Sequence, residues 1–284
     1  MTIWDTFLYS GEEELLKLRL HFLNPLIDYF VIVESTYTFS GNRRLLSDNL
    51  FRKDLQDAYP NKINWVILEE SMPSSTAWQR ESWQRNQINL GMAQAKIGDI
   101  VMLSDLDEIP NSKFIHKARE LRNNEVRVAQ MDLYFYEIDF KSERIWFGTT
   151  ATTWECEIDF QAMRMHGIQG WTLDGLEIID SAGVHMSSIG DAQNLARKIR
   201  SFSHTEFNVF PFNNRIFLGV LIFLGICFDG SEVLKLNRKD TLANKFYCHR
   251  KHHFDSVRLC LGRVLLPLIH RLYKTRVGNL SAPI

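Results

Sequence analysis

The stretch GDIVMLSDLDEIP, residues 98–110, constrains the fold of this chain more than any other part of the sequence. Its residues 100–103 form a short apolar run with the length and flanks of a strand that is buried on both faces of a sheet. Three carboxylates, Asp105, Asp107 and Glu108, follow closely, and a proline ends the run. Because carboxylates at the end of a buried strand need a partner, the stretch predicts an open α/β sheet with a ligand site at its carboxyl edge.

A divalent cation is the partner that the D-x-D pattern favours. Carboxylate oxygens are hard ligands that select Mg²⁺ or Mn²⁺, and such an ion can bridge the diphosphate of a nucleotide-sugar. Two alternatives stay open: the acids cap the next helix or solvate a loop, or they form the aspartyl nucleophile of a haloacid-dehalogenase-like phosphatase. The phosphatase pattern usually lies near the N-terminus and has Thr or Val two residues after the second Asp, where this chain has Ile109.

Residues 2–35 predict a βαβ unit. Residues 2–8 are a candidate strand, Ser10 is placed to cap the helix that follows, and residues 28–33 are a second, buried strand. Strand, helix and strand at this spacing give a right-handed unit with parallel strands. Glu34 then lies at the same edge of the sheet as Asp105, where its carboxylate is a candidate contact for the ribose or base of a nucleotide. A surface acid is the alternative.

The chain up to residue 202 continues with further strands and helices. We expect strands over 63–68 and 126–140, a hairpin over 142–150, and helices over 78–97, 112–121 and 191–202. The helix over 78–97 carries Arg80, Arg85 and Asn86. An arginine at the sheet edge can bind a phosphate with both arms of its guanidinium group. A solvated helical face is the alternative for these residues.

Composition and charge limit the class of protein. The chain has 284 residues, and this length fits one large domain, or one domain and part of a second. With 45% hydrophobic and 24% charged residues, its composition is that of a globular protein. The net charge of −1 gives no field that favours nucleic acid. Cysteines at 156, 227, 248 and 260 lack C-x-x-C spacing and indicate reduced thiols. With no signal-peptide pattern, and with the apolar stretch 216–228 too short to span a bilayer, we expect a cytoplasmic protein.

Taken together, these pieces resemble glycosyltransferase family 17, the family of the bisecting N-acetylglucosaminyltransferase, in the form of its compact bacterial and viral members. The resemblance extends from the N-terminus to about Asn208, and SDLDEIP at 104–110 is its most specific part. Val184 stands where relatives usually have Trp, and Thr150 where they often have Arg, so the acceptor platform and the diphosphate clamp are expected to differ. The other matching stretches are 15–20, 31–35, 38–41, Trp78, 80–81, 84–86, 148–149, 182–183, His185, Ser187 and 201–206.

The resemblance implies a GT-A, Rossmann-like α/β fold with a mixed central sheet flanked by helices, and sugar transfer with inversion at the anomeric carbon. It implies a UDP-sugar donor, with UDP-GlcNAc preferred, a glycan or lipid-linked glycan acceptor, and Mn²⁺ or Mg²⁺ as cofactor. Asp105, Asp107 and His185 would hold the ion, with Glu108 as a further candidate. The donor-binding candidates are Tyr9, Glu34, Thr38, Ser40, Arg80, Arg85, Asn86, Ser104 and Asp105.

An inverting transfer also needs a general base to deprotonate the acceptor hydroxyl. The sequence leaves three candidates open: Glu206, Asp174 and Glu177. Two other functions stay open beside the transferase. A D-x-D metal-dependent phosphohydrolase would release phosphate from generic esters, and a non-catalytic carbohydrate-binding scaffold would bind glycan without turnover.

We expect a catalytic domain over residues 1–210 and a helical extension over residues 211–284. Drawn as a helix, residues 257–276 place their leucines and valines on one side, and the segment contains five Lys or Arg residues and no acid. A basic amphipathic helix of this kind can lie on the inner face of an anionic membrane. Packing on the catalytic domain, with the basic face in water, is the alternative.

Overall fold

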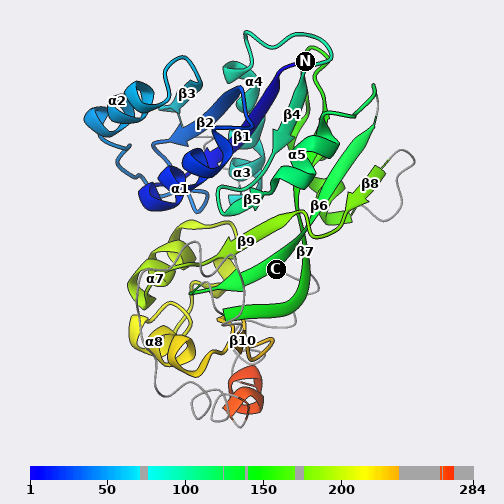
Figure 1. The fold of residues 1–284 in the computed structure, drawn as a ribbon. Helices are drawn as coiled ribbons and strands as arrows, with labels where there is room; N and C mark the ends of the chain where they lie inside the picture. The colour runs from blue at the N-terminus through cyan, green and yellow to red at the C-terminus, as the bar shows by residue number, and fades with distance from the viewer. Residues whose placement is uncertain are drawn as a thin grey trace. The chain divides into compact units, whose positions relative to one another are not determined.

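The computed structural model describes residues 1–70, 76–123, 125–137, 140–169, 176–236, 263 and 265–271. Figure 1 shows their strands and helices along the chain. In chain order these elements are β1 (Ile3–Tyr9), α1 (Glu13–Leu23), β2 (Tyr29–Ser35), α2 (Asn49–Ala58), β3 (Ile63–Leu68), α3 (Ala77–Asn86), α4 (Ile88–Gly91), β4 (Ile100–Leu103), β5 (Glu108–Pro110), α5 (Ser112–Ala118), β6 (Val126–Phe135), β7 (Phe140–Thr153), α6 (Phe160–Gln169), β8 (Leu176–Ile179), β9 (Gly183–Ser187), α7 (Ala192–Ser201), η1 (Thr205–Phe207), α8 (Arg215–Leu224) and β10 (Lys235–Leu236).

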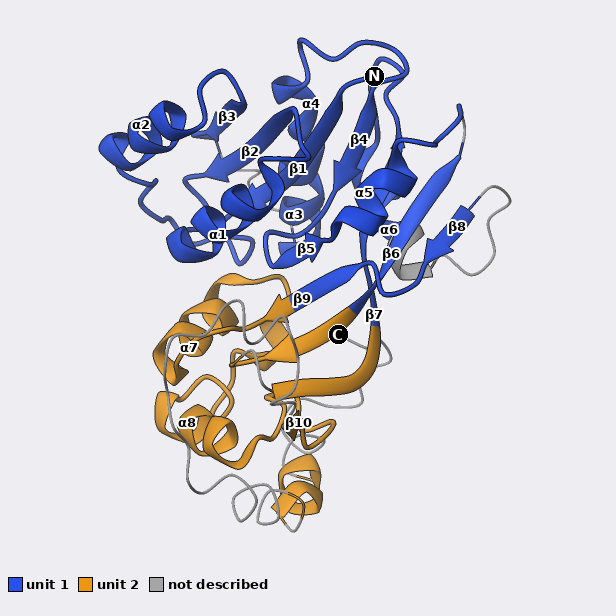
Figure 2. Ribbon diagram, viewed as in Figure 1, with its two compact units in different colours: residues 1–131, 146–185 blue, residues 132–145, 186–284 orange. Residues whose placement is uncertain are grey.

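The chain divides into two compact units (Figure 2). Unit 1 comprises residues 1–131 and 146–185, and unit 2 comprises residues 132–145 and 186–284. The chain passes from one unit to the other within strands β6, β7 and β9. The predicted domain boundary at residue 210 falls inside unit 2.

Unit 1 is built on parallel strands in the order β3-β2-β1-β4. β1 pairs in parallel with both β2 and β4, and β2 pairs in parallel with β3. The sheet continues from β4 to β7, which is antiparallel to it, and then to β6, β9 and β5. This mixed sheet flanked by helices confirms the predicted GT-A, Rossmann-like fold and the parallel βαβ unit within it. Since Tyr9 lies opposite Glu34 and Thr6 opposite Leu103, the carboxyl ends of β1, β2 and β4 share one edge, as predicted.

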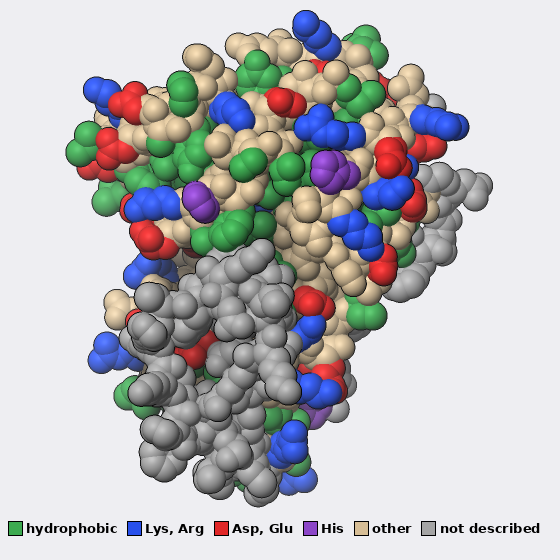
Figure 3. All heavy atoms as spheres, viewed as in Figure 1, with side chains coloured by type: hydrophobic (Ala, Val, Ile, Leu, Met, Phe, Trp, Pro, Cys, Tyr) green, Lys and Arg blue, Asp and Glu red, His purple; other side chains and the backbone are tan. Residues whose placement is uncertain are grey.

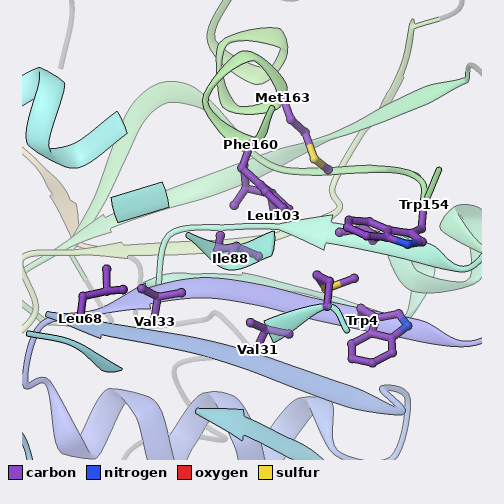
Figure 4. Close-up of a cluster of buried hydrophobic side chains, with 11 residues drawn as sticks. Trp4, Val31, Val33, Leu68, Ile88, Leu103, Trp154, Phe160 and Met163 are labelled. Carbon is purple, nitrogen blue, oxygen red and sulfur yellow. The ribbon is translucent and has the colours of Figure 1, made fainter. Parts of the chain in front are cut away.

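A large apolar cluster of unit 1 lies against one face of this sheet, beneath α4 and α6 (Figure 4). Its buried members are Trp4, Val31, Val33, Leu68, Ile88, Met92, Val101, Leu103, Trp154, Phe160 and Met163. Successive side chains of a strand point to opposite faces of the sheet. Trp4 therefore enters this cluster, whereas the next residue, Asp5, faces α1 on the other side. Burial on both faces explains why β2 and β4 are nearly continuous apolar runs.

Four local predictions are wrong. The helix expected over 78–97 is interrupted, with α3 ending at Asn86 and α4 at Gly91, where a Cβ would lie 2.3 Å from a methyl group of Val31. The expected hairpin over 142–150 lies inside the 14-residue strand β7, whose pairing with β4 extends to Thr153. The strand expected to reach residue 140 ends at 135, because the next residue has a positive φ of 63°. Ser10 makes no cap, and its N–H donates to the side chain of Glu12.

The remaining surface predictions concern charge, thiols and membranes. Charged side chains of both signs are interspersed over the face of unit 1 seen in Figure 3, in keeping with the net charge of −1. Cys156 and Cys227 are free thiols, and the other two cysteines lie outside the described residues. Across the ranges that the structure describes, no helix is long and apolar enough to cross a membrane. Of the amphipathic segment predicted over 257–276, only residues 263 and 265–271 are described, and they are helical.

Candidate functional site

The acidic turn that follows β4 lies at the carboxyl edge of the parallel strands in unit 1. β4 is buried throughout, and the hydroxyl of Ser104 lies 2.7 Å from the hydroxyl of Thr149 on β7. The chain then reverses and enters β5, which pairs antiparallel with β9. The reversal brings two of the acids together, since the backbone N–H of Asp105 donates to the carboxylate of Glu108 at 3.1 Å.

A buried arginine from α1 holds the backbone of this turn. The guanidinium group of Arg19 is fully buried and donates to both carboxylate oxygens of Asp5 on β1, at 2.9 and 2.7 Å. It also donates to three backbone carbonyls of the turn, those of Asp105, Leu106 and Glu108. A buried ion pair is tolerated when further hydrogen bonds satisfy its remaining polar atoms. The Asp5–Arg19 pair is therefore placed to fix the shape of the acidic turn.

Two further arginines contact the acidic side chains. Arg164 of α6 donates to both oxygens of Glu108, at 3.0 and 2.7 Å, and to Asp105 at 2.6 Å. Arg85 of α3 lies 3.6 Å from the other oxygen of Asp105 and also pairs with Glu81. Burial acts to raise the pKa of Asp105, but the charges of Arg164 and Arg85 outweigh it, so that its pKa lies below the usual range. The site therefore presents an ionised carboxylate between two guanidinium groups.

The end of α3 fixes the start of α6, from which Arg164 extends. The side-chain oxygen of Asn86 accepts a hydrogen bond from the backbone N–H of Gln161 at 3.0 Å. The amide of Asn89 makes paired hydrogen bonds with the backbone of Ile158, at 2.8 and 3.1 Å. Asn86, predicted as a donor contact, thus uses its amide oxygen to hold α6 in place.

Glu108 is fully buried and serves as a fixed counter-charge for Arg164. The indole N–H of Trp146 donates to its carboxylate at 2.6 Å. Gly148 on β7 permits this approach, because a Cβ there would lie 3.0 Å from the carboxyl carbon of Glu108 and 2.7 Å from the sulfur of Met131. With bonds from Arg164, Trp146 and the backbone, the carboxylate of Glu108 is fully engaged within the protein.

Asp107 and His185 come together at the pairing of β5 with β9. The strand register places His185 opposite Glu108, and the Nε2 of His185 lies 3.3 Å from a carboxylate oxygen of Asp107. The imidazole ring lies against Trp146, with ring centroids 4.4 Å apart. Its Nδ1 is buried and has no hydrogen-bond partner among the described residues. The Nδ1 is the ring nitrogen that does not face Asp107, so a ligand shared by the pair would contact the Nε2 of His185 and the carboxylate of Asp107.

The spacing of Asp107 and His185 fits two ligands of one cation. Neighbouring ligands of an octahedral ion, each about 2.1 Å from it, stand about 3.0 Å apart, and the two side-chain atoms here are 3.3 Å apart. Within the described residues, no group of three or more His, Cys, Asp or Glu side chains is placed to hold a metal. Mg²⁺ or Mn²⁺ at this pair would take its other ligands from phosphate oxygens and water, as protein-bound Mg²⁺ usually does.

Tyr9 and Glu34 end neighbouring strands at the same edge of the sheet. The buried carboxylate of Glu34 accepts hydrogen bonds from Arg44, from the backbone N–H and hydroxyl of Ser47, and from the indole of Trp65. Tyr9 packs edge-on against Trp65, and its buried hydroxyl has no partner among the described residues. Burial and the charge of Glu34 raise the pKa of Tyr9, so this hydroxyl is a neutral donor. Both residues were predicted to contact the nucleotide-sugar. Of the two, Tyr9 is the one whose side chain has a polar atom, the hydroxyl oxygen, without a hydrogen-bond partner among the described residues.

The loop that carries the predicted donor-binding residues Thr38 and Ser40 is held by α3. The hydroxyls of Thr38 and Ser40 lie 2.9 Å apart. The Nε of Arg80 donates to the backbone carbonyl of Phe39 at 2.6 Å, and Gln84 donates to the carbonyl of Tyr37 at 3.0 Å. Arg80 therefore positions the loop that carries Thr38 and Ser40.

The three candidate bases fall in different places. Glu177 on β8 pairs with Arg127 at 2.7 Å. Glu206 belongs to unit 2, where its carboxylate lies 2.7 Å from the Nδ1 of His204. Asp174 lies outside the described residues. The identity of the base stays a prediction.

Asp5, Arg19, Trp146 and Arg164 were not predicted as site residues. A signal for the first two was present, because Asp5 is the only charged residue of the strand IWDTFLY and Arg19 lies on the same face of α1 as Leu16 and Leu20. Two isolated charges on buried faces of successive elements predict a pair. Arg164 has no such signal, since it follows the acidic turn by more than fifty residues in a helix without a distinctive pattern.

An open sheet of this order binds ligands at the carboxyl edge of its parallel strands, which is where the acidic turn lies. The sequence profile of glycosyltransferase family 17 matches residues 1–216, which is more than half of the chain. The chain belongs to glycosyltransferase family 17, as its motifs predicted.

Solved structures give more distant likenesses. HddC from Yersinia pseudotuberculosis is 9% identical, with a TM-score of 0.36, over 64% of this chain and 92% of that one. A glycosyltransferase involved in the glycosylation of the major capsid of PBCV-1 is 10% identical, with a TM-score of 0.35, over 68% of this chain and 97% of its own. The inositol-1-phosphate CTP transferase from T. maritima is 9% identical, with a TM-score of 0.36, over 70% and 94%. The sequence matches no curated protein.

Proposed function

We propose that this protein transfers N-acetylglucosamine from UDP-GlcNAc to a hydroxyl of a glycan or lipid-linked glycan, with inversion at the anomeric carbon and with Mn²⁺ or Mg²⁺ as cofactor. The observation that carries the proposal is the convergence of Asp105, Asp107, Arg85, Arg164 and His185 at the carboxyl edge of the parallel strands. Cationic and anionic groups side by side suit a ligand that combines a diphosphate with a divalent cation. Membership of family 17 supports the nucleotide-sugar donor.

Arg85 and Arg164 are the proposed contacts for the diphosphate. A guanidinium group binds two phosphate oxygens at once and stays charged at any working pH. The guanidinium group of Arg164 donates to Glu108, and the indole N–H of Trp146 donates to the same carboxylate. The orientation of Arg164 is therefore set before the nucleotide-sugar binds. Negative charge increases on the diphosphate as the sugar departs, and fixed positive groups stabilise that charge most strongly in the transition state.

Asp107 and His185 are the proposed ligands of the cation, and Asp105 lies next to them on the same turn. The ion would supply Lewis acidity to the departing UDP. Asp105 is held by Arg164 and Arg85, so its carboxylate orients these arginines as well as adding negative charge to the site. This division of roles assigns the more enclosed acid, Asp107, to the ion and the more exposed one, Asp105, to the arginines.

The proposed step is a single displacement. The acceptor oxygen forms a bond to the anomeric carbon while the bond from that carbon to the phosphate oxygen breaks, and UDP leaves with the electron pair. The proton of the acceptor hydroxyl passes to a carboxylate base. Glu206, Asp174 and Glu177 are the candidates for this base.

A donor panel tests the proposal. The protein is incubated with UDP-GlcNAc, other UDP-sugars, GDP-sugars and CMP-sugars, with Mn²⁺ or with a chelator, and free nucleotide and free phosphate are measured separately. We expect UDP release from UDP-GlcNAc that requires the cation. Faster release from a GDP- or CMP-sugar would contradict the donor assignment. Release of phosphate from simple esters would favour the phosphohydrolase, and glycan binding without any turnover would favour the carbohydrate-binding scaffold.

A further inference from the structure

Helix α8 of unit 2 is apolar on two opposite sides. Three leucines pack inward from one side: Leu218, Leu221 and Leu224. On the other side Ile216, Val220 and Phe223 are 73%, 47% and 54% exposed. Their spacing of four and three residues makes them one continuous row along the helix. A surface helix normally turns polar residues outward, and a row of large exposed apolar side chains marks a surface that binds something.

Helix α7 lies alongside this row and runs in the opposite direction. A Cβ on Gly219 would lie 3.8 Å from the Cβ of Ala192, at the start of α7. At the other end of the pair, Arg200 donates to the backbone carbonyl of Asn213 at 3.2 Å. Gly219 stands three residues after Ile216 and four before Phe223, so it belongs to the same side of α8 as they do. The start of α7 therefore lies beside the middle of α8, and the Arg200 end of α7 lies beside the start of α8, next to the Ile216 end of the apolar row.

The outer face of α7 is basic. Its buried side consists of Leu195, Ala196 and Ile199. Arg197 and Arg200 are exposed on the opposite side, and Arg215 adds a third exposed arginine at the start of α8. From the N-cap of α7 to residue 228 there are two acids, the exposed N-cap Asp191 and Glu206, which lies 2.7 Å from His204. An apolar row beside an arginine row, with fewer acids than arginines, carries a net positive charge.

We propose that the surface formed by α7 and the outer side of α8, the α7–α8 surface, docks on an anionic lipid bilayer. The apolar row would enter the boundary between headgroups and acyl chains, while the arginines contact the anionic headgroups. A second copy of the chain fits this surface less well, because a two-fold contact through the same face would bring its arginine rows together. The proposal does not depend on the donor site in unit 1.

Vesicle flotation of the full chain tests the proposal. The vesicles contain either phosphatidylcholine alone or an equimolar mixture of phosphatidylcholine and phosphatidylglycerol, at low and at high salt. One variant, I216D/F223D, replaces the two most exposed of the three residues in the apolar row. A second, R197E/R215E, reverses two exposed charges and leaves the buried sides of both helices intact. The matched control is L90D/I97D, which places the same acid at two apolar residues of unit 1 that are 64% and 74% exposed.

We expect the full chain to bind vesicles that contain phosphatidylglycerol, and to bind less well at high salt. Each basic residue near an anionic surface contributes about fivefold in binding, so R197E/R215E should weaken binding at least about twentyfivefold. I216D/F223D should weaken it at least about tenfold, and L90D/I97D should leave it unchanged. Thermal unfolding followed by circular dichroism verifies that each variant is folded.

Two results would overturn the proposal. One is unchanged vesicle binding by both folded α7–α8 variants, which would assign the binding to another part of the chain. The other is no vesicle binding at low salt. If size-exclusion chromatography then shows that I216D/F223D converts a dimer into a monomer, the surface is occupied by a second copy of the chain.

Discussion

Two acidic sites at the same edge of the sheet differ in how they are satisfied. Glu34, at the end of β2, is fully buried, and hydrogen bonds from Arg44, Ser47 and Trp65 occupy its carboxylate. Asp105, just beyond the end of β4, is 39% exposed and lies between two arginines. Glu34 lies in the last two residues of β2 and Asp105 two residues beyond β4, and both were predicted to contact the nucleotide. In the structure the carboxylate of Glu34 is enclosed by protein groups, whereas the side chain of Asp105 is partly exposed to solvent.

We therefore propose that Glu34 is a structural acid and that Asp105 is a functional one. The carboxylate of Glu34 fixes the segment that carries Arg44 and Ser47, so its removal should affect stability more than chemistry. The acidic turn after β4 is fixed through its backbone instead, by hydrogen bonds from Arg19 to three of its carbonyls. Because the turn is held by its carbonyls, the carboxylates of Asp105 and Asp107 can pair with Arg164, Arg85 and His185, the groups proposed to bind the ligand.

Removing Arg19 should produce the largest loss of stability. R19M leaves the Asp5 carboxylate buried without its partner, which typically costs about 3–5 kcal/mol. Chemical denaturation of the wild type and the variant measures this difference.

The double variant D5L/R19M distinguishes the two roles of the arginine. Replacing both charges by apolar groups can be neutral for stability, so the double variant should recover much of the loss. The double variant still lacks the guanidinium group that donates hydrogen bonds to the acidic turn, so its affinity for UDP should stay below that of the wild type. Recovery of both stability and UDP binding would show that Arg19 is only a partner for Asp5.

Replacing Glu34 should give a smaller loss of stability with little effect on turnover. E34Q leaves donors of Arg44 and Ser47 imperfectly paired, which costs about 1–3 kcal/mol. Denaturation and steady-state UDP release are measured on the same preparations. A tenfold or larger rise in the KM for the donor, in a variant as stable as the wild type, would instead make Glu34 the donor contact that the sequence suggested.

Asp99, at the opposite end of β4, should show the smallest effect, and one that depends on pH. Burial acts to raise its pKa, but hydrogen bonds from the backbone of Lys96 and Thr2 and from the indole of Trp4 outweigh it, so its pKa in the folded protein is lowered. A carboxyl group whose pKa is lowered by folding stabilises the fold at pH values above its unfolded pKa of about 3.9. This stabilisation is lost as the pH falls through the pKa of the folded protein.

The D99N variant should therefore be less stable than the wild type at neutral pH, and the difference should shrink below about pH 4. Acid titration of the stability of both proteins measures this. A difference that stays constant down to the lowest pH would mean that the ionised form of Asp99 contributes no stability.

Apolar runs and the position of the acids were enough to predict the parallel sheet, its βαβ unit and the edge where Asp105 and Glu34 lie. These features depend on the local periodicity of the chain. Arg19 and Arg164 were harder to predict, because these two arginines contact the acidic turn only through tertiary packing. The close contact of Gly91 with Val31, at the end of α4, is likewise a long-range constraint that a helical pattern does not contain.

The acidic turn after β4 is proposed to bind a nucleotide diphosphate together with a divalent cation. Calorimetric titration of UDP, with Mn²⁺ and with a chelator, tests it without any acceptor. The wild type should bind UDP at least about tenfold more tightly with Mn²⁺, and D107N and H185A should each lose most of this gain. The control D180N, at an exposed ion pair of unit 1 with Lys113, should behave as the wild type. UDP binding that is equally tight without Mn²⁺ and unchanged in D107N would contradict the account.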